Sequence, residues 1–189
     1  MIKSIDYGFY KVDYEYIKFL HSYDSEVYFN SSYKDKSKPF LGIMVGMNGL
    51  NYFIPLSSAK AKHKKWKNVS REHFLIYEII DTTINIEGDI YKSYSKDKKM
   101  HILGLLDIKK MIPVPQGYFE KIVFDNLNDF RYQDLFKKEY AFCLKIKDKV
   151  LSRVENIYNR QKETGEVKTM YCNFSVCEKA MLEWLKDKK

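Results

Sequence analysis

Several motifs that mark nucleotide-driven and metal-dependent enzymes are missing from this sequence. It contains no G-x-x-x-x-G-K-[ST] loop, no H-E-x-x-H helix, no G-x-S-x-G turn and no EF-hand loop. The chain has four histidines, and no two of them have the spacing of metal ligands: His21, His63, His73 and His101. We therefore expect neither a P-loop enzyme nor a metal-dependent hydrolase, and we expect no cofactor and no bound metal.

Cysteines and long apolar runs are also scarce. Cys143, Cys172 and Cys177 are odd in number and lack a zinc spacing, so they provide no complete disulfide framework. We interpret them as reduced, buried thiols of a cytoplasmic protein. No apolar stretch is long enough to span a membrane, and the first residues lack the apolar core of a signal peptide. We therefore expect no membrane association.

Aromatic residues and positive charge are plentiful. Aromatics make up 16% of the 189 residues and the hydrophobic fraction is 45%, which predicts a packed single domain over residues 1–189. The formal net charge of +8 is concentrated, because the stretch from Lys34 to Lys67 holds eight lysines and one acidic residue. Neutralising phosphates releases counterions, so this concentration of positive charge favours a polyanionic partner.

The order of the expected elements indicates an α+β fold. Short apolar segments predict strands mainly within residues 5–123, at 9–12, 39–45, 51–56, 74–80 and 101–106. Asn48-Gly49 predicts a tight hairpin turn, and the polar residues 85–99 predict a mobile insertion. Strands that precede long helices favour a compact, twisted, barrel-like sheet with the helices packed outside.

Helical periodicity predicts helices mainly over residues 13–23, 128–162 and 174–186. Asp13 is the expected N-cap of the first helix. The second is long enough to require a kink or a break, and its apolar residues predict one buried stripe: Cys143, Ile146, Val150, Val154 and Ile157. Ser175 and Glu178 have the spacing of a capping box for the last helix.

One segment, from Ser57 to Trp66, gathers hydroxyl, ammonium, imidazole and indole groups directly after an expected strand. RNA cleavage needs no nucleophile from the protein, because the ribose 2′-OH can attack its own phosphate. The protein must hold the in-line geometry, stabilise negative charge on the phosphorane and move two protons. Hydroxyls and lysines suit the charge, a histidine suits proton movement, and aromatic rings stack on unpaired bases. The segment therefore predicts RNA binding and cleavage without a metal ion.

Other functions explain part of the same pattern. A non-catalytic RNA-binding or regulatory protein needs the same basic and aromatic residues, but it does not require Ser58. A serine–lysine hydrolase would use Ser58 and Lys60, although no nucleophile elbow is visible. DNA is a further possible partner, but a mechanism through the 2′-OH cannot cut it. A lysine run after a strand is also common as a solvated loop, and paired serines are common in turns.

A series of segments resembles the toxins of type III toxin–antitoxin systems, the ToxN/AbiQ family. The series runs from about residue 9 to residue 185: Phe9-Tyr10, residues 14–20, residues 38–43, residues 52–60, residues 103–106, residues 111–115 and residues 172–175. The resemblance implies a strongly bent, mostly antiparallel sheet like the SH3-like barrel of Kid/MazF-type toxins, with long helices packed outside and C-terminal helices. Ala59 stands where proline is common in the family, and the insertion at 89–99 is longer than usual.

The resemblance also implies an activity and its partners. Such toxins are metal-independent endoribonucleases with a preference for A-rich sequence, and they leave a 2′,3′-cyclic phosphate. Their implied partners are a structured antitoxin RNA processed from tandem repeats, and cellular and phage RNA substrates. Toxin and antitoxin RNA form a hetero-oligomeric assembly, and the system acts by abortive phage infection.

By motif, the resemblance implies six catalytic residues. Ser58 matches the family's catalytic serine, Ser57 the hydroxyl residue before it, and Lys60 the active-site lysine. The other three implied catalytic residues are Lys38, Tyr33 and His63. We expect the serines to hold the scissile phosphate, the two lysines to stabilise its charge, and His63 or Tyr33 to pass a proton. The residues expected to contact RNA elsewhere are Lys34, Lys36, Lys62, Lys64, Lys65, Trp66 and Lys67.

Overall fold

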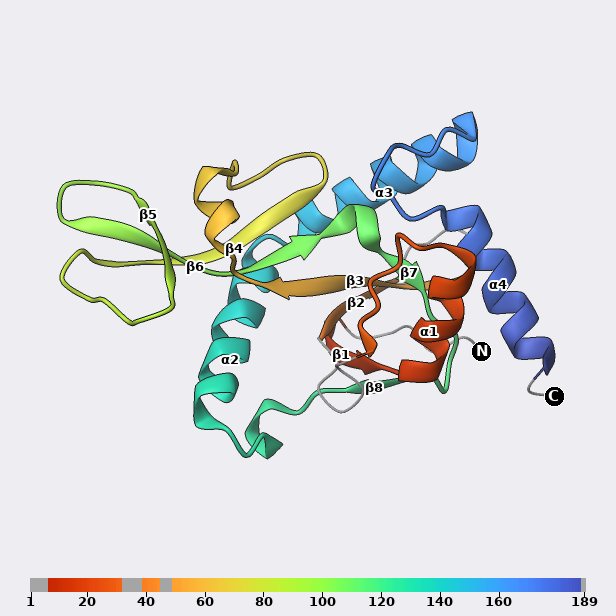
Figure 1. The fold of residues 1–189 in the computed structure, drawn as a ribbon, viewed down its shortest axis with the longest axis horizontal. Coiled ribbons are helices and arrows are strands. Elements are labelled where there is room, and N and C mark those ends of the chain that lie inside the picture. Colours follow the sequence, from red (N-terminus) through yellow and green to blue (C-terminus); the bar gives the residue numbers. More distant parts are fainter. Residues whose placement is uncertain (1–6, 32–38, 45–48, 188–189) are drawn as a thin grey trace. The chain divides into compact units, whose positions relative to one another are not determined.

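A computed structural model describes residues 7–31, 39–44 and 49–187 of the chain. These residues form two compact units (Figure 1). The first unit is drawn from Met1–Pro55, Asp107–Ile122 and Asp148–Lys189, and the second consists of Leu56–Leu106 and Val123–Lys147. The expectation of a single domain stays a prediction, and each unit is described by itself below.

The first unit contains a small antiparallel sheet. Its strands are β1 (Gly8–Val12), β2 (Phe40–Met44), the first residues of β3 (Asn51–Ser58), β7 (Ile112–Pro113) and β8 (Phe119–Lys121). The strands are hydrogen-bonded in the order β8-β1-β2-β3, and β7 pairs with β3. Pairing of Phe40 with Pro55 and of Met44 with Asn51 confirms the β2–β3 hairpin. Of its predicted turn, Asn48 lies outside the described residues and Gly49 has a φ of 68°, which favours glycine.

Three helices complete the first unit: α1 (Tyr14–Tyr23), α3 (Lys147–Thr164) and α4 (Phe174–Asp187). Asp13 caps α1 as expected, because its Oδ1 accepts the Tyr16 N–H at 2.8 Å. The capping box predicted for α4 is wrong. Asn173 caps this helix instead, since its Oδ1 accepts the Val176 N–H at 3.1 Å. Helices α1 and α4 lie side by side (Figure 1), and the Trp184 ring packs against Tyr16 at 5.8 Å.

Glu178 is directed into the first unit rather than toward the start of its own helix. Its Oε1 accepts hydrogen bonds from the hydroxyls of Tyr52 and Tyr158, each at 2.7 Å, and its Oε2 pairs with the Lys162 Nζ. Burial alone raises the pKa of this carboxyl, but the hydrogen bonds from Lys162, Tyr158 and Tyr52 outweigh burial and lower its pKa. Glu178 is therefore an ionised group that joins β3, α3 and α4 within this unit.

The second unit is built around β6 (Lys98–Asp107). Its other strands are the end of β3, β4 (His73–Asp81) and β5 (Ile90–Ser93). β6 lies between β3 and β4, and β5 pairs with β6. The apolar core of this unit includes Leu75, Met100, Ile102 and Leu105. Helix α2 (Phe130–Lys145) packs on β4, where the rings of Tyr77 and Phe142 are 5.1 Å apart.

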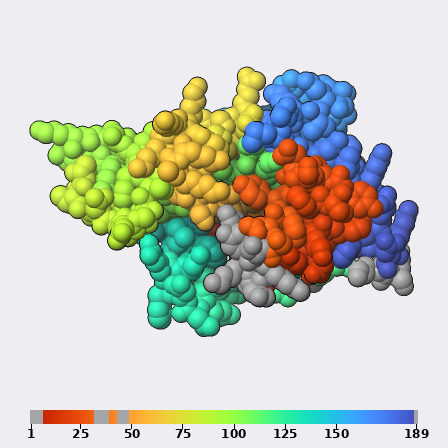
Figure 2. All heavy atoms as spheres, viewed as in Figure 1, coloured from red at the N-terminus to blue at the C-terminus, as the bar shows by residue number. Residues whose placement is uncertain are grey.

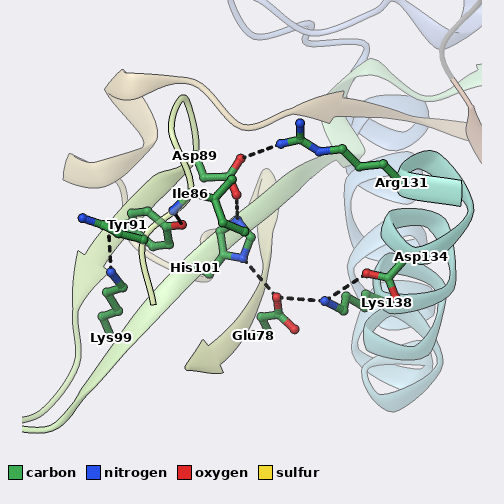
Figure 3. Close-up of polar contacts among 10 residues, drawn as sticks. Glu78, Ile86, Asp89, Tyr91, Lys99, His101, Arg131, Asp134 and Lys138 are labelled. Atoms are coloured by element: carbon green, nitrogen blue, oxygen red, sulfur yellow. Dashed lines mark hydrogen bonds and ion pairs between the residues drawn. The ribbon is translucent and has the colours of Figure 1, made fainter. Parts of the chain in front are cut away.

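Residues 85–99, which we expected to be mobile, include the hairpin that joins β5 to β6. A polar cluster connects this hairpin to β4 and α2 (Figure 3). The His101 Nδ1 lies 3.0 Å from Glu78 Oε1, and its Nε2 lies 3.1 Å from Asp89 Oδ2. On α2, Arg131 forms an ion pair with Asp89, and Lys138 forms an ion pair with Glu78. The polar composition that suggested a mobile segment therefore supplies the contacts that order it.

The long helix expected at 128–162 is broken, as predicted, into α2 and α3. The break falls at Ile146, whose φ of −108° and ψ of 12° depart from helical values. Of the residues in the predicted buried stripe, Cys143, Val150 and Val154 are buried, whereas Ile146 and Ile157 are only partly buried. Tyr158, not Ile157, continues the buried face of α3. A break resets the helical phase, so periodicity cannot be extended across it.

The α+β class and the antiparallel pairing are confirmed, but the expected SH3-like, Kid/MazF-like barrel is not confirmed. The hydrogen-bonded order β4-β6-β3-β2-β1-β8 ends at two different edge strands, so the described strands do not close. All three cysteines are buried and form no disulfide, in agreement with the sequence. No helix within the described ranges is long and apolar enough to cross a membrane.

Candidate functional site

Ser58, the last residue of β3, and Lys60, two residues later, are both exposed. Side chains alternate between the two faces of a strand, and here Ser57 is buried whereas Ser58 is exposed. Lys60 has extended backbone angles, φ −135° and ψ 153°, and is also exposed. Residues two apart in a chain have Cα atoms no more than about 7 Å apart. An exposed hydroxyl and an exposed ammonium group this close along the chain can act on one ligand.

Ser57 does not share this arrangement. Only 4% of the residue is exposed, and its Oγ has no hydrogen-bond partner among the residues that the structure describes. Leaving a buried hydroxyl unsatisfied costs about 1–3 kcal/mol. The sequence predicted two hydroxyls acting together, but strand alternation directs them to opposite faces, so Ser58 is the better placed of the two to meet a ligand.

His63 fixes the backbone that carries Lys60. It lies in the short helix η2 (Ala61–Lys65) and is 1% exposed. The His63 Nδ1 accepts the backbone N–H of Lys60 at 3.1 Å, and the backbone N–H of His63 donates to the Lys60 carbonyl oxygen at 2.8 Å. Burial lowers the pKa of His63, and the nearby charges of Lys62, Lys60 and the His73 ring lower it further. A neutral imidazole with one nitrogen occupied in this way suits an anchoring role.

Trp66 anchors the other end of the loop. Its ring centroid lies 4.8 Å from the centroid of the His63 ring and 4.8 Å from that of the His73 ring. The Lys62 Nζ lies 5.2 Å from the ring centroid, at cation–π distance. The indole also packs on the apolar core of the second unit. These contacts leave little of the ring free to stack on a base.

We expect Trp66→Ala to destabilise the protein by roughly 2–3 kcal/mol, because it removes a half-buried aromatic from the loop and the core. Urea unfolding followed by circular dichroism measures this change, with Trp66→Phe as the matched control that keeps an aromatic ring. An unchanged unfolding midpoint for Trp66→Ala, together with weaker RNA binding, would instead identify the indole as a base-stacking surface.

The remaining lysines of the segment form an exposed basic loop. Lys62, Lys64, Lys65 and Lys67 are all exposed, and the segment lies at the surface next to the β5–β6 hairpin (Figure 2, orange to yellow and green). Lys92 of β5 holds the base of the loop, because its Nζ donates to the Trp66 carbonyl at 2.9 Å and to the Asn68 Oδ1 at 3.1 Å. Sequence reasoning missed Lys92, since nothing in its local pattern links it to residues so distant in the chain.

The structure brings only part of the predicted site together. Four predicted residues lie outside the described residues: Tyr33, Lys34, Lys36 and Lys38. Within the described ranges, no group of three or more His, Cys, Asp or Glu side chains could hold a metal ion. Ser58 and Lys60 thus form the centre of the described site, with the basic loop beside them.

Comparison with known proteins places the chain in a family. The model of the family "Toxin ToxN, type III toxin-antitoxin system" matches residues 8–182 of the chain. The chain belongs to this ToxN family. The match spans both compact units, so the ToxN family model covers nearly all of the described chain.

Curated members of the ToxN family are similar over most of their length. Endoribonuclease ToxN of Bacillus thuringiensis subsp. kurstaki is 27% identical over 185 residues, which cover 93% of this chain and 83% of the relative. Endoribonuclease AbiQ of Lactococcus lactis subsp. lactis is 29% identical over 179 residues, which cover 93% of this chain and 85% of the relative. These relatives carry the name endoribonuclease.

Solved structures of similar proteins have the same fold. One, from work on selective toxin inhibition by a non-coding RNA pseudoknot, has a TM-score of 0.70 at 25% identity and covers 94% of this chain and 97% of its own. Another structure comes from work on a processed non-coding RNA that regulates a bacterial antiviral system. It has a TM-score of 0.69 at 25% identity and covers 91% of this chain and 95% of its own. The structure of AbiQ, a lactococcal anti-phage endoribonuclease, aligns with a TM-score of 0.71 at 24% identity over 96% and 98% of the two chains.

Proposed function

We propose that this protein is the endoribonuclease toxin of a type III toxin–antitoxin system. Ser58 and Lys60 are proposed as the catalytic residues of its RNA-cleaving site. The observation that carries the proposal is the exposure of these two residues, two apart at the end of β3 and beside an exposed basic loop. Membership of the ToxN family, whose curated relatives are named endoribonucleases, supports the reaction type.

The proposed reaction uses the substrate's own ribose. The 2′-oxygen attacks the adjacent phosphorus, the bond from phosphorus to the 5′-oxygen breaks, and a 2′,3′-cyclic phosphate remains. One proton leaves the 2′-OH and one reaches the departing 5′-oxygen. The Ser58 hydroxyl donates a hydrogen bond to a phosphate oxygen, and the Lys60 ammonium stabilises the phosphorane charge. Neither residue requires a metal ion for this role.

Four other predicted residues support these two in the proposal. Lys38 and Tyr33, which lie outside the described residues, are proposed to contribute charge stabilisation and proton transfer. Ser57 is proposed to orient the strand end rather than to contact the phosphate, because its hydroxyl is buried. His63 is proposed to hold the Lys60 backbone, because its Nδ1 accepts the Lys60 N–H.

The proposed partners are RNAs. Work on two solved structures concerns inhibition or regulation by a non-coding RNA. By analogy, a structured antitoxin RNA processed from tandem repeats would occupy the basic loop and form a hetero-oligomeric assembly with the toxin. Free toxin would cut cellular and phage RNA in the cytoplasm, with a preference for A-rich sequence, and would thereby abort phage infection.

Removing lysines from the basic loop is expected to reduce the salt dependence of RNA binding. Each phosphate contact adds about 0.7 to the slope of log K against log salt for a single strand. Lys64→Ala combined with Lys65→Ala should therefore lower the magnitude of the slope by about 1–1.5, measured with non-cleavable 2′-O-methyl RNA. The control pair is Lys179→Ala with Lys186→Ala, which removes the same charge from exposed positions on α4. Equal slopes for both pairs would count against the loop as the RNA contact.

A cleavage assay tests the proposed function. Wild-type protein is mixed with an A-rich RNA in EDTA, and the 3′ ends of the products are identified. The proposal expects new 2′,3′-cyclic phosphate ends. Tight binding without cleavage would favour a non-catalytic RNA-binding protein, and products with ordinary 3′-hydroxyl ends would contradict attack by the 2′-OH.

A further inference from the structure

A buried carboxyl lies against the strand end described above. Glu139 of α2 is 4% exposed, and within the described part of the chain no hydrogen bond or ion pair to its carboxyl is found. Its helix neighbours differ, because Asp134 and Lys138 are exposed and pair with each other at 3.1 Å. Buried acidic groups without partners are rare because they are costly, so this one requires an explanation.

The carboxyl of Glu139 occupies the place of a side chain on β6. A Cβ added to Gly104 would lie 2.4 Å from Glu139 Oε1 and 3.1 Å from the Ser57 carbonyl oxygen. Real Cβ atoms do not approach another atom this closely, so a side chain at residue 104 would require the end of the Glu139 side chain to move. The carboxyl of Glu139 thus uses space on β6 that a glycine at residue 104 leaves open.

Strand pairing places Ser58 on the same face as this carboxyl. Gly104 is the direct partner of Ser58 in the antiparallel β3–β6 pair. Side chains of directly opposed residues point to the same face, with Cβ atoms about 4.5–5.5 Å apart. The Glu139 carboxyl lies next to the Gly104 Cβ position, so its Oε1 is within about 8 Å of the Ser58 Cβ, on the face where a phosphate held by Ser58 would bind.

We propose that Glu139 is a positioning residue for RNA cleavage: its neutral carboxyl packs on Gly104 and supports Ser58, and its ionisation expels the phosphate from Ser58. This inference rests on the proposed ribonuclease function. A neutral acid beside the phosphate costs little, whereas a carboxylate repels it strongly because the surroundings have a low dielectric constant. Glu139 does not touch the RNA itself, because its side chain is buried where α2 meets β6.

The groups around Glu139 are consistent with this role. Burial raises the pKa of Glu139 to about 8, so the carboxyl is mostly protonated at neutral pH. On α2, the facing titratable group is Cys143, whose own pKa is raised by burial and by Glu139. Gly104 presents no side chain from β6, and Ser57 presents a carbonyl from β3. Glu78 of β4 is directed to His101 and Lys138 instead.

The test is the pH dependence of cleavage by wild type and Glu139→Gln, which keeps the shape and removes the charge. Values of kcat and KM for an A-rich RNA are measured from pH 6 to 9.5, corrected for uncatalysed hydrolysis and normalised to each protein's value at pH 7. Wild-type kcat/KM is expected to fall at least tenfold between pH 7.5 and 9.5, mainly through KM, and this fall should be absent in Glu139→Gln. Asp134→Asn, an exposed carboxylate on the same helix, is the matched control and should keep the wild-type profile.

The outcomes separate this inference from the proposed function. If kcat/KM of Glu139→Gln falls at alkaline pH as much as that of wild type does, the role of Glu139 is overturned, and the proposed ribonuclease function still stands. A wild type that cuts no RNA at any pH overturns both. A merely structural carboxyl would change the unfolding temperature without changing the pH profile, so thermal unfolding is measured beside the kinetics.

Discussion

Ser58→Ala is expected to slow RNA cleavage by about 100- to 1,000-fold while leaving the fold unchanged. The hydroxyl is exposed at the end of β3, so its removal leaves no cavity and no buried partner unsatisfied. Deleting one donor that stabilises a transition state has an effect of this size in other enzymes. Single-turnover cleavage of a radiolabelled A-rich RNA measures the rate, and circular dichroism checks the fold.

The matched control for this variant is Ser93→Ala. Ser93 is likewise an exposed serine at the end of a strand, β5, in the same compact unit. It should retain the wild-type rate. If Ser58→Ala also cuts at the wild-type rate, the hydroxyl has no part in the reaction, and the catalytic assignment must move to Lys60 or to the residues of the 33–38 segment.

Glu178→Ala is expected to lower the free energy of unfolding by about 3 kcal/mol. The substitution leaves two tyrosine hydroxyls and the Lys162 ammonium without their shared acceptor, and removing one partner of a buried ion pair usually costs about 3–5 kcal/mol. We place the loss of stability at the low end of this range because the Lys162 side chain is 27% exposed, so water can solvate its ammonium group when Glu178 is removed. Urea unfolding at pH 7 measures the change, and Glu155→Ala, an exposed glutamate on α3, is the control.

The stability that Glu178 contributes should also depend on pH. Because its pKa in the folded protein is lowered, the unfolded chain binds a proton at a higher pH than the folded one does. The contribution is therefore fully present above the unfolded pKa of about 4.3 and is lost as the pH falls below it. The gap in stability between wild type and Glu178→Gln should narrow at about pH 3. A gap that stays constant with pH would mean that the ionised form of Glu178 is not favoured by its partners.

The sequence was sufficient where local chemistry decides the structure. The apolar run before Ser57, the turn signal at Gly49 and the cap at Asp13 each depend on neighbouring residues, and all three were predicted. Ser58 and Lys60 were predicted by their residue types and by motif. The exposure of Ser58 follows from strand alternation once the strand is known to continue through Ser58.

Other features depend on partners that are distant in the chain. Ser175 and Glu178 have the spacing of a capping box, but Tyr52 and Tyr158 attract the Glu178 carboxylate and Asn173 caps the helix. The polar residues 85–99 suggested mobility because their partners, on β4 and α2, are not evident from the sequence. Glu139 likewise resembles any helical glutamate until the missing side chain of Gly104 shows where its carboxyl lies.

In the proposed reaction, RNA bound at Ser58 and Lys60 is cut by its own 2′-OH. The most direct test is an A-rich RNA that carries a single 2′-deoxyribose on the 5′ side of the mapped scissile phosphate, compared with the all-ribose RNA. We expect normal cutting of the all-ribose RNA and no cutting at the modified position. Cleavage there at the all-ribose rate would contradict attack by the 2′-OH, because the nucleophile would then have to be a water molecule or a group of the protein.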